Sequence, residues 1–190
     1  MIVTVQAFRT YYRTSIDADD ALILSCLTAA EGGINEACAR EFVVAGAASP
    51  RSYAPDSVRS VLRIHDCTEI TSVVEDGVTF TASQYVAEPA PQVAWSGQVS
   101  PYQQIRRYGS VWYTDCGNAT VTVTAKWGWA AIPEQVKQAV YIAAKDLFDT
   151  RDVKWGIAAV GEYGPLSVRE NRTVMQLVAP FRRVESFGIA

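Results

Sequence analysis

The chain has 190 residues, 49% hydrophobic and 19% charged, which suits one globular domain or one domain that carries an insertion. A formal net charge of -3 offers no overall attraction for nucleic-acid phosphates, so a duplex-binding enzyme or repressor is disfavoured. No apolar run reaches the roughly 18 residues of a membrane span, and the opening sequence lacks the cationic and apolar sections of a signal peptide. We therefore expect a protein made in a cytosol.

The N-terminal part predicts helices. Thr4 is positioned to cap a short helix over the sequence VQAFRTYYR. A stronger pattern predicts a helix over residues 17–41, because acidic residues stand at its front and its apolar residues recur at steps of three and four. Gly32 and Gly33 interrupt this pattern, each at a cost of about 1 kcal/mol relative to alanine. Either a kink or the close approach of another backbone would explain them, and the sequence leaves both open.

The middle part, residues 57–127, changes to a period of two. Apolar and polar residues alternate from Ala119 to Trp127, which predicts a strand with one buried face. Asp76-Gly77 between two apolar runs predicts a hairpin, since both central positions of a type I′ turn need positive φ. Further strands are expected at the sequences VRSVLRI, EITSVV and VTFTA, near residues 85–87, and as one or two edge strands within residues 102–113. About five to seven antiparallel strands result, enough for a small sandwich or barrel.

The C-terminal part returns to helical spacing. Pro133 suits the first position of a helix, which should end near Asp152, and a shorter helix is expected over residues 169–179. The order of elements predicts an α+β fold: a helical core of two long helices and a short C-terminal helix, with an inserted antiparallel domain that resembles a β-sandwich or barrel. The expected divisions are residues 1–56, 57–127 and 128–190.

The residues that could carry chemistry do not form a convincing site. The four cysteines include no CxxC pair and only one histidine is present, so we expect no metal and no cofactor. His65 and Cys67 would share one face of a strand while Asp66 points away, which argues against a catalytic trio. The glycines at 156, 161 and 164 follow a helix and lack a phosphate-binding motif, so a hinge or linker is the favoured interpretation.

The C-terminal end differs in charge from the rest of the chain. Residues 169–190 contain four arginines and two glutamates, a net charge of +2, which leaves -5 elsewhere. This asymmetry makes the end a candidate contact arm. Arg106-Arg107-Tyr108 combines adjacent cations with an aromatic ring, and a solvated edge strand is its simplest interpretation.

Several long stretches resemble a known family. The sequences TVTAKWGWAAIPEQVKQAVYIAAKDLFDTRD, GIAAVGEYGPLSV and APFRR, with VLRIHDCTEI and the front helix upstream, resemble the head-to-tail adaptor (connector) proteins of siphophages that infect actinobacteria. The resemblance covers nearly the whole chain, and its most specific element is the run from Val121 to Asp152 with the glycine loop behind it.

The resemblance implies a structural protein of the virion neck, not an enzyme. Twelve copies would form a ring below a dodecameric portal, a stopper or tail-completion protein would bind the other side, and genome DNA would pass through the lumen without sequence-specific binding. The C-terminal arm would dock on the portal. The residues expected at the portal or subunit interface are Tyr163, Arg169, Arg172, Phe181, Arg182 and Arg183.

Two other functions remain open from the sequence. One is a ligand- or carbohydrate-binding β module with helical flanks, for which Trp95, Trp112 and Tyr113 would supply the aromatic platform. The other is a small hydrolase that uses His65. Binding of a soluble glycan would favour the first, and loss of activity on His65→Ala the second.

Overall fold

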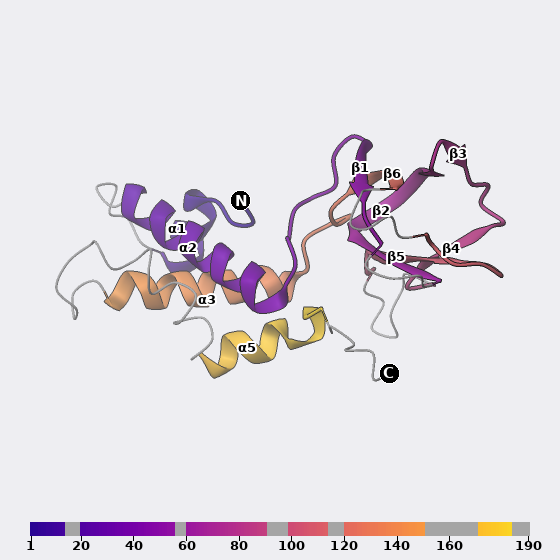
Figure 1. The fold of residues 1–190 in the computed structure, drawn as a ribbon. Coiled ribbons are helices and arrows are strands. Elements are labelled where there is room, and N and C mark those ends of the chain that lie inside the picture. Colours follow the sequence, from indigo (N-terminus) through magenta and orange to yellow (C-terminus); the bar gives the residue numbers. More distant parts are fainter. Residues whose placement is uncertain (14–19, 56–59, 91–98, 114–119, 151–170, 184–190) are drawn as a thin grey trace. The chain divides into compact units, whose positions relative to one another are not determined.

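The computed structural model describes residues 1–13, 20–55, 60–90, 99–113, 120–150 and 171–183. The chain divides into two compact units: a helical unit, residues 1–42 with 132–190, and a β unit, residues 43–131 (Figure 1). Each unit is described by itself. The three-part division expected at residues 57 and 128 stays a prediction, because compactness alone does not define a folding domain.

Two helices form the front of the helical unit. Helix α1 covers Val5–Tyr12, and the hydroxyl of Thr4 caps it by accepting a hydrogen bond from the Ala7 amide at 3.2 Å, as the sequence predicts. Helix α2 covers Asp20–Cys38 and continues through Gly32 and Gly33 without a break. A Cβ added at Gly32 would meet nothing within 4 Å, so no backbone packs against that position.

Two more helices complete the described helical unit. Helix α3 covers Glu134–Thr150 and lies along both α2 and α5, the latter covering Arg172–Val178 (Figure 1). A 3-10 turn over Ala179–Phe181 follows α5 directly. The apolar stripes of these helices form the buried core, which includes Ile23, Leu27, Ile34, Val136, Val140, Ala144, Val174 and Val178.

The β unit contains an antiparallel sheet. Its described strands are β1 (Ser49–Tyr53), β2 (Val61–Glu75), β3 (Val78–Thr79), β4 (Tyr85–Glu88), β5 (Tyr102–Arg107) and β6 (Val121–Trp127). The strand order is β1-β6-β2-β5-β4, and β3 forms a hairpin with β2. Helices and this sheet together confirm the α+β class. Strand β5 lies between β2 and β4, so the expectation of an edge strand there is wrong.

Strand β2 is one element where the sequence predicts two. Its first half pairs with β5 and its second half with β6, and the register shifts between Arg63 and Cys67 and again between Cys67 and Glu69. Such bulges bend a strand and increase its twist. If it were straight, a strand of this length would extend roughly 50 Å. The bends instead curl the sheet around a core that includes Leu62, Ile64, Cys67, Val73, Ile105, Trp112, Val121, Val123 and Ala125.

The incoming and outgoing segments of the β unit pair with each other. Val44 and Trp129 form a parallel bridge, with the Trp129 amide 2.7 Å from the Val43 carbonyl and the Ala45 amide 2.8 Å from the Trp129 carbonyl. Gly128 precedes this bridge with φ +116°, and a Cβ there would lie 2.5 Å from the Val43 oxygen. Only glycine fits this position.

Candidate functional site

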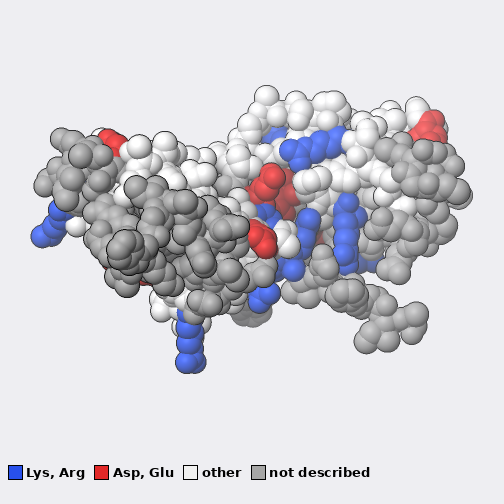
Figure 2. Space-filling view, turned by 60° about the vertical axis from the view of Figure 1, so that its left-hand side comes forward, with Lys and Arg blue, Asp and Glu red and all other residues white. Residues whose placement is uncertain are grey.

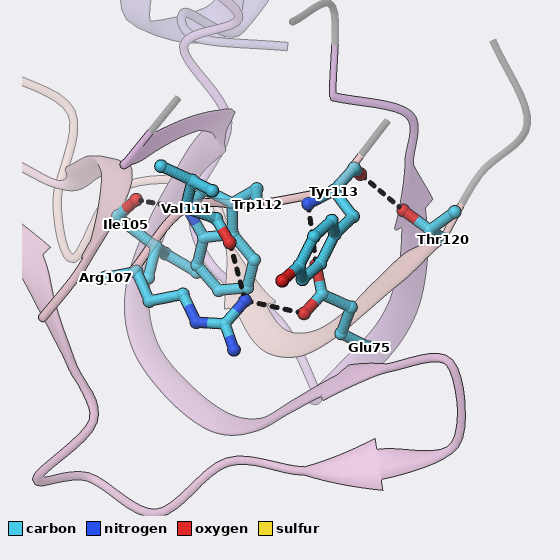
Figure 3. Close-up of polar contacts among 7 residues, drawn as sticks. All are labelled: Glu75, Ile105, Arg107, Val111, Trp112, Tyr113 and Thr120. Atoms are coloured by element: carbon cyan, nitrogen blue, oxygen red, sulfur yellow. Dashed lines mark hydrogen bonds and ion pairs between the residues drawn. The ribbon is translucent and has the colours of Figure 1, made fainter. Parts of the chain in front are cut away.

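A buried ion pair joins the last residue of β2 to the last residue of β5. The Glu75 side chain is only 6% exposed, and its Oε2 accepts a hydrogen bond from Nη1 of Arg107 at 2.7 Å (Figure 3). Its other oxygen, Oε1, accepts from the backbone amide of Tyr113 at 3.1 Å. Because Arg107 lies beside the start of β2 and Glu75 ends it, the pair connects the two ends of the curled strand.

The guanidinium of Arg107 is enclosed by aromatic rings and backbone. Its Cζ lies 4.5 Å from the ring centre of Phe80 and 5.4 Å from that of Trp112. Nη1 also donates to the carbonyl of Val111 at 2.7 Å, and the Trp112 indole donates to the Ile105 carbonyl at 3.4 Å (Figure 3). These contacts replace the water that the two charges lose on burial. They also fix the backbone from Arg107 to Tyr113.

Three exposed residues adjoin this buried pair, through the sheet, a backbone hydrogen bond or the next position in the chain. Val78, which pairs with Glu75 in the β2–β3 hairpin, is 63% exposed. Tyr108 and Tyr113, which follow the two buried anchors Arg107 and Trp112 in the chain, are each 58% exposed. We refer to Val78, Tyr108 and Tyr113 as the tyrosine patch. Tyrosine is enriched at protein interfaces, so the patch is a candidate contact surface.

Two pairs of oppositely charged side chains meet across neighbouring strands. Arg106 forms a two-point contact with Glu88, at 2.7 and 3.1 Å, and Lys126 lies 2.6 Å from Glu69. The hydrogen bond from Arg106 lowers the pKa of Glu88 below its ordinary value. The face drawn in Figure 2 likewise shows acidic side chains between basic ones. The cations in these two strand pairs are partly neutralised by their partners, which weakens their attraction for nucleic-acid phosphates.

The expected contact arm begins with a segment that belongs to the helical core. Phe181 is 4% exposed, and its ring packs edge-on against that of Phe42, with ring centres 6.2 Å apart. Its carbonyl accepts from Nη1 of Arg40 at 3.2 Å, and the amide of Arg183 donates to the carbonyl of Cys38 at 2.9 Å. Phe181 is therefore an anchor within the helical unit.

The other residues expected at the interface lie in different settings. Arg172 and Arg182 are exposed, and Arg183 is half-buried. Tyr163 and Arg169 lie outside the described residues. The structure thus brings Phe181, Arg182 and Arg183 together against the end of α2, while Arg172 stands at the opposite end of α5.

The residues considered for catalysis are poorly suited to it. Cys67 is fully buried, and burial raises the pKa of its thiol to about 12, so the nucleophilic thiolate is not populated near neutral pH. Nδ1 of His65 lies 2.8 Å from the hydroxyl oxygen of Tyr53, which is a neutral partner, whereas the base of a catalytic triad is held by a carboxylate. Among the described residues, no three His, Cys, Asp or Glu side chains gather closely enough to hold a metal ion.

The aromatic platform expected for a carbohydrate module is also not formed as predicted. Trp112 is fully buried beneath Arg107 and Phe80, so its face is not accessible to a sugar ring. Trp95 lies outside the described residues, and Tyr113 is exposed. The alternative of a carbohydrate module requires Trp112 to face solvent, and its burial contradicts that requirement.

Sequence reasoning missed Glu75 and Arg107 as partners. They are 32 residues apart, and the local patterns predict only a hairpin turn beside Glu75 and a solvated strand at Arg107. The only available signal was Trp112, since an arginine near a buried tryptophan often stacks on it. No pattern of spacing identifies which carboxylate such an arginine meets.

The fold as a whole defines a class: an α+β chain in which an antiparallel sheet interrupts the sequence of a helical unit. Within the part of the chain that the structure describes, no helix is both long and apolar enough to cross a membrane. No protein-family model matches the sequence, and no curated protein does.

Three solved structures that are similar to this chain come from gene transfer agent (GTA) particles. A chain in the neck of an empty GTA particle, computed with C6 symmetry, is 22% identical with a TM-score of 0.58 over 98% of this chain and 92% of that one. A chain in the neck of a native particle, computed with C12 symmetry, is 19% identical with a TM-score of 0.56 over 99% and 95%. A chain of the native virion is 23% identical with a TM-score of 0.56 over 98% and 92%.

Proposed function

We propose that the chain is a structural head-to-tail adaptor in the neck of a tailed-bacteriophage particle, where twelve copies form a ring. The observation that supports this most is the extent of the likeness to the GTA neck chains, which covers at least 98% of this chain and at least 92% of those. Both units are therefore included in the match. The C6 and C12 symmetries of those necks are compatible with a ring of identical copies.

The proposed partners follow from that position. The portal lies on one side of the ring, a stopper or tail-completion protein on the other, and genome DNA passes through the lumen without sequence-specific binding. A net charge of -3 and strand charges that pair with each other support a lumen that does not hold the passing phosphates. In this proposal the chain is made in the host cytoplasm, performs no catalysis and becomes part of the virion.

The arm that contacts the portal starts at the anchor formed by Phe181. The buried ring and the Arg183–Cys38 backbone bond hold residues 181–183 against the end of α2. Arg172, Arg182 and Arg183 supply cationic side chains on or near the surface, and Tyr163 and Arg169 are proposed to contribute from the preceding segment. Phe181 acts by positioning these residues.

Co-sedimentation with portal particles tests the arm. Deletion of residues 184–190 keeps the Phe181 anchor, so the shortened chain should retain the circular dichroism of the full chain and lose portal binding. Deletion from residue 181 is a poor test, because it also removes a buried aromatic ring. Unchanged co-sedimentation of the 184–190 deletion would overturn the arm assignment.

Negative-stain images of the full chain bound to its portal test the ring itself. Twelvefold rings at the portal's tail side are the expected result. Monomers scattered over the portal surface, or no binding to the portal at all, would contradict the adaptor function.

A further inference from the structure

We propose that the tyrosine patch (Val78, Tyr108 and Tyr113) is a contact surface between neighbouring copies of this chain. The inference rests on the proposed ring and adds to it the side chains through which copies meet. It goes beyond the C-terminal residues discussed above, since the patch belongs to the β unit.

The sequence RRYGSVWY supplies both tyrosines of the patch, each directly after an anchor residue, and Val78 comes from the β2–β3 hairpin. Arg107 and Trp112 are held inside the β unit, and each is followed directly by a tyrosine that is 58% exposed. The amide of Tyr113 is bonded to Glu75, and the amide of Tyr108 donates to the Gln84 carbonyl at 2.9 Å. Both tyrosines therefore start from a backbone that hydrogen bonds fix in place.

The buried pair contributes position more than stability. Two charges taken out of water regain little net free energy from each other, and apolar side chains of similar volume stabilise a core at least as well. Glu75 and Arg107 instead fix the position of the backbone near the patch. Arg107 donates a hydrogen bond to the Val111 carbonyl, and Glu75 accepts one from the Tyr113 amide (Figure 3). A tyrosine on a fixed backbone has only two side-chain torsions to immobilise, so it loses little entropy on binding.

The charge of the patch and of the chain favours a second copy as the occupant. Asp76 is the only exposed charged residue in the hairpin turn beside Val78, and the segment from Tyr108 to Tyr113 contains no charge. A nucleic acid would need cations here. Two copies that each carry a net charge of -3 repel one another, so an uncharged surface is where they approach at least cost.

Ring closure requires such a surface. In a cyclic ring each copy meets its neighbours through two different surfaces, one on each side, rather than through one surface shared with its twin. The tyrosine patch is proposed as one of these two. Its complement on the next copy is then identified by the experiment.

Site-specific photo-crosslinking in assembled necks tests the proposal. Benzoylphenylalanine is placed at Tyr113 and, in a matched control, at Val99, which is 47% exposed in the same unit and precedes the opposite end of β5. Irradiation should give a covalent dimer of this chain from the Tyr113 probe and at least tenfold less from the Val99 probe. Mass spectrometry of the dimer then names the opposing residues.

Other crosslinking outcomes overturn the proposal. A Tyr113 product with a different neck protein would show that the patch faces another partner, and absence of any product would show that it faces solvent. Absence of the chain from purified necks would contradict the proposed function itself. Presence in necks without a dimer contradicts only the contact between copies.

A second measurement avoids the crosslinker. The double variant Tyr108→Ser with Tyr113→Ser should lower the fraction of chain found in rings by about tenfold or more, since two interface tyrosines are removed. Val99→Ser is the control and should assemble normally. Both variants change exposed side chains, so their circular dichroism and portal binding should match those of the unchanged chain, and normal ring formation by the double variant would refute the inference.

Discussion

The two units hold their distant segments together in different ways. The β unit joins the ends of its curled strand through the buried charges of Glu75 and Arg107, which are 2.7 Å apart. The helical unit fastens its last segment through an apolar ring, Phe181 against Phe42, and a backbone hydrogen bond to Cys38. One closure is electrostatic and directional, and the other is mainly apolar.

The difference shows what each closure contributes. When one partner of a buried ion pair is removed, the other charge stays buried without compensation. Replacement of Glu75 or Arg107 alone is therefore strongly destabilising. An apolar ring contributes free energy in proportion to the area it buries, with little directional requirement. The β unit therefore gains a defined arrangement of its surface residues, whereas the helical unit gains a stable base for the C-terminal segment.

The largest effect is expected from breaking the ion pair. Arg107→Ala leaves the Glu75 carboxylate buried without its cation and should lower the free energy of unfolding by about 3–5 kcal/mol. Urea unfolding, followed by tryptophan fluorescence, measures the loss. Arg106→Ala is the matched control, because Arg106 is exposed and should cost less than about 1 kcal/mol.

A double replacement sharpens the same comparison. The ion pair could stabilise the β unit and position the patch as two separate contributions. In that case the double variant Glu75→Leu with Arg107→Met should recover most of the stability that Arg107→Ala loses. The double variant should still assemble poorly, since the amide of Tyr113 loses its acceptor. Full recovery of both stability and assembly would show that the charges do not position the patch.

Breaking the apolar closure should cost slightly less. Phe181→Ala removes a buried ring and should destabilise the helical unit by about 3 kcal/mol, seen as an earlier loss of helical circular dichroism in urea. Phe181→Leu retains much of the apolar volume and should cost about half as much. Equal stability of the alanine variant and the unchanged chain would mean that the segment is not fastened by its ring.

Alkaline pH should weaken both units moderately through their buried thiols. Burial raises the pKa of Cys67 to about 12 and that of Cys38 to about 11, from an ordinary value of 9.0. Above pH 9 the unfolded chain releases these protons while the folded chain keeps them. Stability is therefore fully present below pH 9 and is lost as pH rises toward 11 and 12.

Urea midpoints at about pH 8 and pH 10.5 measure this loss. We expect a decrease of about 1–2 kcal/mol for each thiol over that interval. Cys67→Ala should flatten the pH dependence, whatever its effect on stability at pH 8. An identical slope in the variant would show that Cys67 does not contribute.

The smallest effect is expected at the surface of the sheet. Lys126→Ala breaks an exposed ion pair with Glu69 and should change the free energy of unfolding by less than about 1 kcal/mol. Thermal unfolding at low salt gives the most sensitive measurement, because salt screens such pairs. If Lys126→Ala lost as much stability as Arg107→Ala, the difference in exposure between the Lys126–Glu69 and Glu75–Arg107 pairs would not explain their contributions.

Local signals were sufficient for much of the fold. The Thr4 cap, the alternation that ends at Trp127 and the turn at Asp76-Gly77 each depend on a few adjacent residues, and the structure confirms all three. Helix α3 follows Pro133 as predicted. These features are determined by neighbours in the sequence, so a single chain reveals them.

The parts that could not be predicted depend on distant partners. Strand β1 contains a proline and no alternation, and it forms only because β6 supplies its hydrogen bonds. The sequence predicts two strands in place of β2, because the bulge near Cys67 interrupts the period of two. Trp112 is buried by Phe80 and Arg107. The residues next to Trp112 in the sequence do not indicate either contact.

The bridge between Val44 and Trp129 has a consequence for how such a chain can change over evolution. Because the segments that lead into and out of the β unit lie side by side, the sheet is a module whose two ends are adjacent. A module whose two ends are adjacent closes only a short gap in its host, so it can be lengthened, shortened or exchanged at little entropic cost to the helices. Only glycine fits at position 128, beside this junction. A glycine at the matching position of a related chain would therefore mark where its inserted module ends.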